Sequence, residues 1–111
     1  MEAVLLASAA RTTNGNGSPV DSIAGNDNIG EDVRVFVDVT AVSGTTPSMT
    51  VTLQAVVEGV AYDLASSSAI TATGQYTFTA TVVPRSVQEK HVITGTTPSF
   101  TYSVRLFRKD D

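Results

Sequence analysis

The chain has 111 residues, with 7 Lys plus Arg, 11 Asp plus Glu and a net charge of −4. This length fits one domain with one core, and the acidic balance excludes the basic surface that nucleic-acid binding needs. The chain has no cysteine, which excludes disulfides, thiol nucleophiles and thiolate metal sites.

The N-terminal stretch MEAVLLASAA predicts a first strand at residues 3–10. A signal peptide is the alternative, because the short apolar run ends in Ala-Ser-Ala. Glu2, however, stands where a signal peptide has its basic region, and the run is barely long enough. No stretch of the sequence approaches the roughly 20 apolar residues of a membrane helix. We therefore expect no membrane partner.

Residues 11–32 (RTTNGNGSPVDSIAGNDNIGED) are dominated by Gly, Asn, Asp, Ser and Thr. These residues favour tight turns and loops. The segment is therefore expected to be a long polar loop or arm, with at most a short strand at 19–24. A loop of about twenty residues is unusual in a compact domain and often has a function.

From Val33 onwards, apolar and polar residues alternate, and Thr and Val dominate. This period of two is typical of half-buried strands. Clear strands are expected at 33–39, 49–55, 76–82 and 100–106, and shorter ones at 60–65, 68–73 and 87–93. Their spacing predicts a single all-β domain over 1–111. The expected architecture is an antiparallel β-sandwich, jelly-roll or immunoglobulin-like, of roughly seven or eight strands.

The five residues GTTPS occur twice, at 44–48 and at 95–99. In each copy Gly gives the backbone freedom, and Pro fixes φ without donating to a ladder. Both copies are therefore expected to be hairpin loops with a structural role, and convergence on a good turn is favoured over duplication. The strands that they would join are 33–42 with 49–57 and 87–94 with 100–107.

His91 is the only histidine of the chain, so any Ser–His–Asp arrangement would need it as the base. Alternation places it on one strand face with Val87, Glu89 and Ile93, and its charged neighbours indicate a surface position. The sequence has no nucleophile elbow, phosphate-binding loop, dinucleotide fingerprint or zinc motif. We expect no enzyme activity, no catalytic residue and no cofactor.

The acidic stretch GNDNIGED at 25–32 contains Asp27, Asn28, Glu31 and Asp32. Oxygen ligands of this kind suit Ca²⁺ in flexible loops. Their spacing does not match an EF-hand loop, however, and Asx and Gly residues commonly cap turns. Turn capping without a metal is the favoured interpretation.

Two aromatic residues, Phe36 and Phe107, interrupt the polar faces of their strands. An exposed aromatic side chain would suit a sugar-binding platform or a subunit interface. Arg34 and Asp38 share the strand face of Phe36 and are expected to form solvated ion pairs. The other aromatic residues of the alternating segments occupy apolar positions and are expected in the core: Tyr76, Phe78, Phe100 and Tyr102.

Three stretches together resemble a group of short structural proteins of tailed bacteriophages. They are VLLASAART (4–12), VFVDVTAVSGTTPSMTVTLQ (35–54), and ITATGQYTF (70–78) with GTTPSFTYSV (95–104). In that group the corresponding features are an LLASAART-like strand, a VxxDVTAxxGTPxxxVTLQ hairpin and a TPSxTxSV strand. The resemblance covers most of the chain except residues 12–32.

The resemblance implies a capsid decoration (cement) protein that binds the outer surface of a phage head and stabilises it. The partner would be the major capsid protein, and a homotrimer is favoured. The N-terminal segment and residues 11–32 would make much of the contact. The protein would be made in the host cytoplasm and reside on the virion. A tail or neck component, and a carbohydrate-binding or adhesion module on the virion, are the alternatives. No catalytic residue is transferred.

Overall fold

The computed structural model describes residues 2–21, 31–83 and 86–108, and they form an all-β antiparallel sandwich, as predicted. The described residues include no helix that is long and apolar enough to cross a membrane. In chain order the strands are β1 (Glu2–Arg11), β2 (Gly15–Asn16), β3 (Val20–Asp21), β4 (Glu31–Val57), β5 (Val60–Ser66), β6 (Gly74–Val83) and β7 (Ser86–Arg108).

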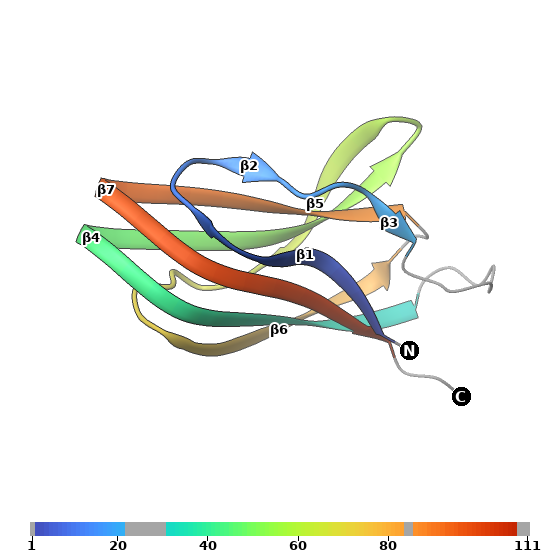
Figure 1. Ribbon diagram of the computed structural model, residues 1–111. Helices are drawn as coiled ribbons and strands as arrows, with labels where there is room; N and C mark the ends of the chain where they lie inside the picture. The colour runs from blue at the N-terminus through green and yellow to red at the C-terminus, as the bar shows by residue number, and fades with distance from the viewer. Residues whose placement is uncertain (1, 22–30, 84–85, 109–111) are drawn as a thin grey trace.

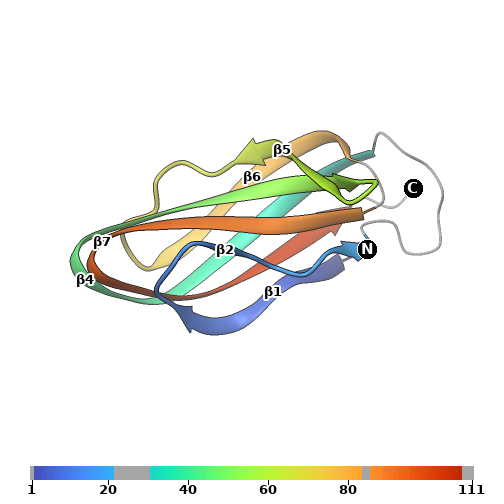
Figure 2. The same ribbon diagram turned by 90° about the horizontal axis from the view of Figure 1, so that it is seen from above.

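The two longest strands, β4 and β7, bend sharply and fold back at the same end of the molecule (Figures 1 and 2). Each strand therefore gives one arm to each of two layers. The antiparallel pairing of β4 with β7 continues through the bend from one layer into the other. Layer 1 has the order β1, 99–108 of β7, 31–43 of β4, and β6; layer 2 has β2 with β3, 86–94 of β7, 48–57 of β4, and β5.

The two bends coincide with the GTTPS segments, and the prediction that these are hairpin loops is wrong. Each segment does reverse the chain. The two arms that it joins lie in opposite layers, however, and the arms of β4 pair with β7 and not with each other. Segments 44–48 and 95–99 lie side by side, with Ser43 opposite Ser99 and Thr45 opposite Thr96.

Each bend fits against the backbone of the other bend. Gly44 (φ +109°) and Gly95 (φ +123°) have backbone conformations that side chains disfavour. A Cβ atom on Gly44 would lie 2.6 Å from the carbonyl oxygen of Thr97, and one on Gly95 would lie 2.8 Å from that of Thr46. Thr46 and Thr97, which occupy the same position in the two bends, have nearly the same backbone conformation, with φ of +47° and +45°. Reciprocal packing thus explains why the same five residues occur twice.

The inward faces of the two layers form one apolar core, as the alternation predicts. Phe100 and Tyr102 are fully buried, and Tyr76 and Phe78 pack half-buried against the core. The buried cluster consists of Leu5, Val33, Val35, Val37, Val39, Met49, Val51, Leu53, Ile70, Ala80, Val87, Ile93, Phe100, Tyr102, Val104 and Leu106.

Two segments differ from the expected pattern. The strand expected at 68–73 is reduced to one isolated bridge between Ile70 and Met49. Residues 12–21 run along β7 through β2 and β3 and do not project as an arm. The backbone N–H of Ile93 donates to Asn14 Oδ1 at 2.7 Å, which fastens this segment. Residues 22–30 lie outside the described residues, so turn capping at 25–32 stays a prediction.

Candidate functional site

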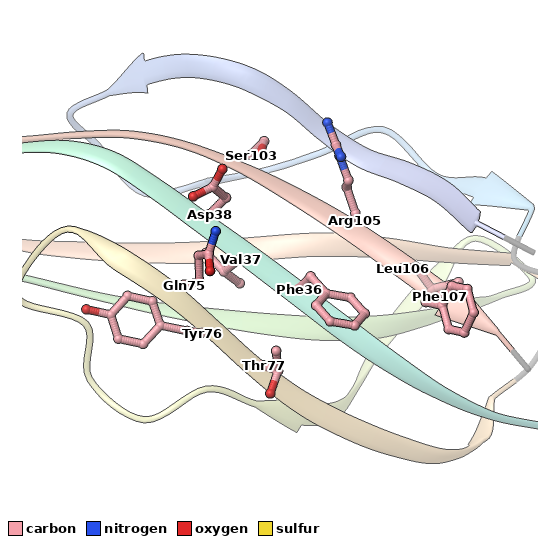
Figure 3. A pocket seen from close by; sticks show the side chains of 10 residues that line it. All are labelled: Phe36, Val37, Asp38, Gln75, Tyr76, Thr77, Ser103, Arg105, Leu106 and Phe107. Atoms are coloured by element: carbon pink, nitrogen blue, oxygen red, sulfur yellow. The ribbon is translucent and has the colours of Figure 1, made fainter.

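A groove with a volume of about 490 Å³ lies on the outer face of layer 1. It crosses β6, the first arm of β4 and the second arm of β7 (Figure 3). We call it the layer-1 groove. Its lining residues are Phe36, Val37, Asp38, Gln75, Tyr76, Thr77, Ser103, Arg105, Leu106 and Phe107.

Strand alternation and register bring the polar lining residues together. Because Val35 and Val37 point into the core, Phe36 and Asp38 point outward. The register places Phe36 between Arg105 and Thr77. It places Asp38 between Ser103 and Gln75 in the next outward row. The groove therefore offers hydroxyl, amide, carboxylate and guanidinium groups on one rigid surface.

The two phenylalanines that interrupt the polar faces both open to solvent in this groove. Phe36 is 40% exposed and Phe107 is 47% exposed, so their expected exposure is confirmed. Arg34 lies opposite Phe107 in the register, which makes Phe36 and Phe107 diagonal neighbours. Diagonal neighbours in a sheet lie roughly 7–8 Å apart. The groove thus contains a pair of adjacent apolar rings in a polar surrounding (Figure 3).

Arg34 lies on the same outer face, beside the groove. One of its guanidinium nitrogens, Nη1, donates to the Thr77 hydroxyl at 3.2 Å. A strand rises about 3.3 Å per residue, so Arg34 and Asp38 are roughly 13 Å apart along β4 and do not pair with each other. Asp38 lines the groove, whereas Arg34 lies beside it.

His91 is buried, contrary to the prediction of a surface position. Its side chain is 6% exposed, and Glu89 beside it is fully buried. The shared face with Val87 and Ile93 is therefore the inner face of layer 2. His91 Nδ1 lies 2.9 and 3.1 Å from the two carboxylate oxygens of Glu89. The charged neighbours of His91 in the sequence indicated a solvated strand face. In the structure the Glu89 carboxylate and the His91 ring instead meet each other's hydrogen-bonding needs inside the core.

Tyr102 and Arg11 complete this buried polar cluster with Glu89 and His91. The Tyr102 hydroxyl donates to Glu89 Oε2 at 3.3 Å. Burial raises the pKa of the Tyr102 phenol above its ordinary value, and the negative charge of Glu89 raises this pKa further. The Arg11 guanidinium lies 5.1 Å from the centre of the Tyr102 ring and donates to the Tyr102 carbonyl oxygen at 3.2 Å.

The buried polar cluster has no room for a substrate. Residues 15–17 cover it: a Cβ atom on Gly15 would lie 3.1 Å from His91 Nε2, and the Gly17 N–H donates to the Glu89 carbonyl oxygen at 2.8 Å. A nucleophile must reach both its base and its substrate. His91 is therefore a structural residue that holds the carboxylate of Glu89. Among the described residues, no group of three acidic or histidine side chains could hold a metal ion.

The outer face of layer 2 carries a polar ladder whose groups satisfy one another. Gln54, which is 6% exposed, accepts from Asn16 at 3.2 Å and from Gln88 at 2.7 Å, and donates to Asp63 at 2.8 Å. Lys90 pairs with Asp63 at 3.7 Å. Such a ladder links β2, β7, β4 and β5 and fixes their register.

Sequence reasoning singled out Phe36, Asp38 and Phe107 of the groove but not its other polar members. Gln75, Thr77, Ser103 and Arg105 occupy outward positions of predicted strands, which was the available signal. Their meeting depends on which strands are neighbours and in what register. A single sequence does not contain that information, since every Thr/Val strand has the same pattern.

Neither protein-family models nor curated proteins match the chain. Solved structures do match its fold. The Clostridium thermocellum xylanase 10B structure with CBM22-1 and GH10 modules, complexed with xylohexaose, matches with a TM-score of 0.52, 11% identity and 76% coverage of this chain. This chain spans 18% of that larger protein.

Two isolated carbohydrate-binding modules also match. The module CBM6cm-2 of Cellvibrio mixtus lichenase 5A, in complex with cellotriose, gives a TM-score of 0.50 at 10% identity, over 96% of this chain and 88% of that one. The CBM22-1 xylan-binding domain of Paenibacillus barcinonensis Xyn10C gives 0.49 at 14% identity, over 98% and 83%.

The fold therefore resembles that of β-sandwich carbohydrate-binding modules. At these identities the likeness concerns the fold alone. The resemblance to phage structural proteins rests on the sequence stretches alone.

Proposed function

We propose that this protein is a non-enzymatic carbohydrate-binding module and that its layer-1 groove binds a chain of pyranose sugars. The observation that carries the proposal is the pair of exposed phenylalanines, Phe36 and Phe107, inside a groove with polar walls. The volume of about 490 Å³ falls within the roughly 300–1,000 Å³ of ligand sites.

The chemistry of the lining fits a sugar in two ways. A pyranose ring has an apolar face of C–H groups, which buries well against an aromatic ring. Its rim consists of hydroxyl groups, which pair with the amide of Gln75, the carboxylate of Asp38 and the hydroxyl of Ser103. Two adjacent rings would hold two successive sugar units. Because the side chains stand on paired strands, the site is preformed and costs little ordering on binding.

The groove lacks the pair of carboxylates that glycoside hydrolysis generally uses. Asp38 is the one carboxylate among the described residues that line it. Glu89, which lies beside His91, is buried in the core and closed to substrate. These features support binding without cleavage. The complexes of similar folds with xylohexaose and cellotriose make linear β-1,4-linked oligosaccharides the first ligands to test.

The test is isothermal titration calorimetry with xylohexaose and cellohexaose. Phe36→Ala and Phe107→Ala should each weaken binding roughly fivefold, which corresponds to about 1 kcal/mol of lost stacking. Tyr62→Ala is the matched control, because Tyr62 is 54% exposed but lies on β5 of layer 2. An equal loss in all three variants, or no heat with any glycan in a broad panel, would rule the groove out as a sugar site.

A role on a phage particle is the second candidate, and the three sequence stretches that resemble phage structural proteins favour it. In this role the protein binds the major capsid protein on the outside of the head as a homotrimer, is made in the host cytoplasm and resides on the virion. A binding module displayed on a capsid or tail would also satisfy the first proposal. Repeated sites around symmetry axes would let a modest contact per subunit add up.

The second candidate is tested by mixing the protein with undecorated capsids and imaging them by cryo-electron microscopy. Density at three-fold or quasi-three-fold positions would support capsid decoration. Density at the tail would support the tail alternative. If the protein associates with no part of the particle, the virion role is excluded, while the sugar-binding proposal is unaffected.

A further inference from the structure

The described residues of the sandwich form four sheet edges. Strands β1 and β6 bound layer 1, while β2 with β3 and β5 bound layer 2. An edge strand presents unpaired backbone N–H and C=O groups, so it can pair with a strand of another molecule. Proteins prevent such pairing with charged residues, prolines, bulges or very short edge strands. The four edges can therefore be compared by the protection that each one has.

Three of the four edges are protected. The register of β1 is irregular on both sides of Leu6, and the Arg11 guanidinium holds this irregular part by donating to the carbonyl oxygens of Ala7 at 2.8 Å and Ala9 at 3.1 Å. Strands β2 and β3 have only two residues each. Strand β5 has an irregular register with β4 and contains the charged residue Asp63. Irregular, short or charged edges are poor templates for a further strand.

The fourth edge, β6 (Gly74–Val83), lacks these features. Its ten residues, GQYTFTATVV, include no acidic residue, no basic residue and no proline, whereas every other strand longer than two residues contains a charge. Among the described residues β6 pairs with β4 alone, and this register is regular from Ala80 to Gly74. Figures 1 and 2 show β6 along the margin of layer 1. Because the chain has a net charge of −4, an uncharged edge is where two copies meet with least repulsion.

The residue pattern of β6 is complementary to itself. Its outward residues from 77 to 81 are exposed threonines, and its inward residues from 76 to 80 are apolar: Thr77, Thr79 and Thr81, and Tyr76, Phe78 and Ala80. In an antiparallel pair, residues directly opposite each other point to the same face. Two β6 strands around a two-fold axis therefore match threonine with threonine and apolar with apolar residues, and such pairs are stabilising. Tyr76 and Phe78 are only half-buried against the core, so a partner strand would cover them further.

We propose that two copies of this chain associate through their β6 edges, antiparallel around a two-fold axis, so that their layer-1 sheets join into one continuous sheet. This inference goes beyond the proposed sugar binding. Strand β6 also contributes Gln75, Tyr76 and Thr77 to the layer-1 groove, so the dimer carries two grooves on one sheet, where a long polymer can reach both. A two-fold contact is complete with two copies, so the homotrimer of the virion role would need a different contact.

The size of the edge sets the expected affinity. Ten residues span roughly 33 Å, and a sheet layer is about 10 Å thick. A strip of these dimensions is well below the roughly 800 Å² per partner of a standard protein interface. We therefore expect a weak dimer, with a Kd on the order of 10–100 μM.

The first test is sedimentation velocity of the full chain from about 1 μM to about 1 mM, a range that brackets this Kd. The mass should rise from the 11.6 kDa of one chain towards twice that value. Thr79→Lys should raise the Kd at least roughly tenfold, because it places like charges in the contact. Ser8→Lys is the matched control, since Ser8 is exposed on β1 at the opposite edge of layer 1. It adds the same charge and should leave the Kd unchanged. Thermal unfolding checks that both variants fold.

Cross-linking gives a second measurement that does not depend on a charge. The chain has no cysteine, so each introduced thiol is unique. Opposite Cβ atoms of an antiparallel pair are about 4.5–5.5 Å apart, close to the distance that a disulfide needs. Single cysteines at 77, 79 and 81, and doubles at 77 with 79 and at 79 with 81, sample every two-fold register centred between 77 and 81. At least one should form a covalent dimer under mild oxidation, and Ser8→Cys should not.

Several results would overturn the proposal. They are a monomer at every concentration, a trimeric mass, an equal effect of Thr79→Lys and Ser8→Lys on the Kd, or cross-linking that is no faster at β6 than at Ser8. A concentration-dependent dimer that Thr79→Lys alone weakens would support it. Failure of the dimer leaves the sugar-binding proposal intact, because each chain has its own layer-1 groove.

Discussion

At the scale of single residues, the buried pair of Glu89 and His91 departs most from the usual pattern of a β-sandwich core. A buried carboxylate is costly unless it is paired and hydrogen-bonded. Here His91 and Tyr102 supply the partners at 2.9 and 3.3 Å. The pair also lies where residues 15–17 close over the core, so its polar groups hold the N-terminal segment in place.

His91→Ala should therefore destabilise the protein, whereas the surface position expected from the sequence would make this substitution nearly neutral. The substitution leaves the buried Glu89 carboxylate without its nearest partner, and removing the partner of a buried charge typically costs about 3–5 kcal/mol. Urea unfolding followed by circular dichroism measures the loss. Lys90→Ala, on the outer face, should cost under about 1 kcal/mol.

The double variant Glu89→Leu with His91→Leu is the control that removes both members of the buried pair. It leaves no buried charge, so it should lose less stability than His91→Ala alone. If His91→Ala costs no more than Lys90→Ala, the buried pair does not contribute to the stability of the core.

Tyr102 should make stability depend on pH on the alkaline side. Its folded-state pKa is raised by burial and by Glu89, while the unfolded phenol titrates near pH 10. The folded state thus keeps its proton when the unfolded state has lost it, so this stabilisation is complete below pH 10 and falls as pH rises above it. One proton corresponds to a slope of about 1.4 kcal/mol per pH unit.

The measurement is the difference in unfolding free energy between wild type and Tyr102→Phe from pH 9 to pH 11.5. The difference isolates Tyr102 from other groups that titrate in this range. It should shrink by about 1 kcal/mol as pH rises from 10 to 11. A pH-independent difference would mean that the phenol titrates normally in the folded protein.

At the scale of elements, the paired bends of β4 and β7 connect the two layers. Each bend needs a glycine at the point where the backbone of the other bend passes. Hairpins would have placed the arms of each strand in one sheet. The observed bends instead carry the β4–β7 ladder around the corner, so that two strands close one end of the sandwich together.

Gly44→Ala and Gly95→Ala should therefore be strongly destabilising. Each substitution forces a Cβ atom into a backbone with φ above +100° and against a carbonyl oxygen at 2.6 or 2.8 Å. Backbone strain alone costs about 1–2 kcal/mol, and the clash should raise the total above roughly 3 kcal/mol. Thermal unfolding of each variant measures it.

Gly59→Ala is the matched control for the strain term. Gly59 also has a positive φ, of +80°, but an added Cβ would meet no atom within 4 Å. It should lose only about 1–2 kcal/mol. Similar losses at Gly44 and Gly59 would contradict the reciprocal packing of the two bends.

At this scale the sequence predicted more about strands than about their connections. Alternation identified the inward faces of 33–39, 49–55 and 100–106 correctly, because burial of one sheet face imposes a period of two. It did not distinguish a hairpin from a bend between layers. Both need Gly and Pro between two alternating segments, and only the pairing of distant strands separates them.

At the scale of the whole molecule, the two outer faces differ in a way that the sequence does not reveal. The layer-2 face carries the polar ladder, whose members bond to one another around Gln54. The layer-1 face has the groove, with apolar rings left open to solvent. In the sequence, the outward positions of both layers belong to similar Thr-rich alternating strands. Phe36 and Phe107 were the exception, since an aromatic residue on a polar face is conspicuous without knowledge of the fold.

The most direct test of the sugar-binding groove is a nuclear magnetic resonance titration of ¹⁵N-labelled protein with xylohexaose and cellohexaose. Amide shift changes should be confined to Arg34, Phe36, Asp38 and their neighbours on β6 and β7 in layer 1. The polar ladder of layer 2 and the buried polar cluster should remain unchanged. Changes centred on layer 2, or none with either hexamer at millimolar concentration, would contradict a sugar site in the layer-1 groove.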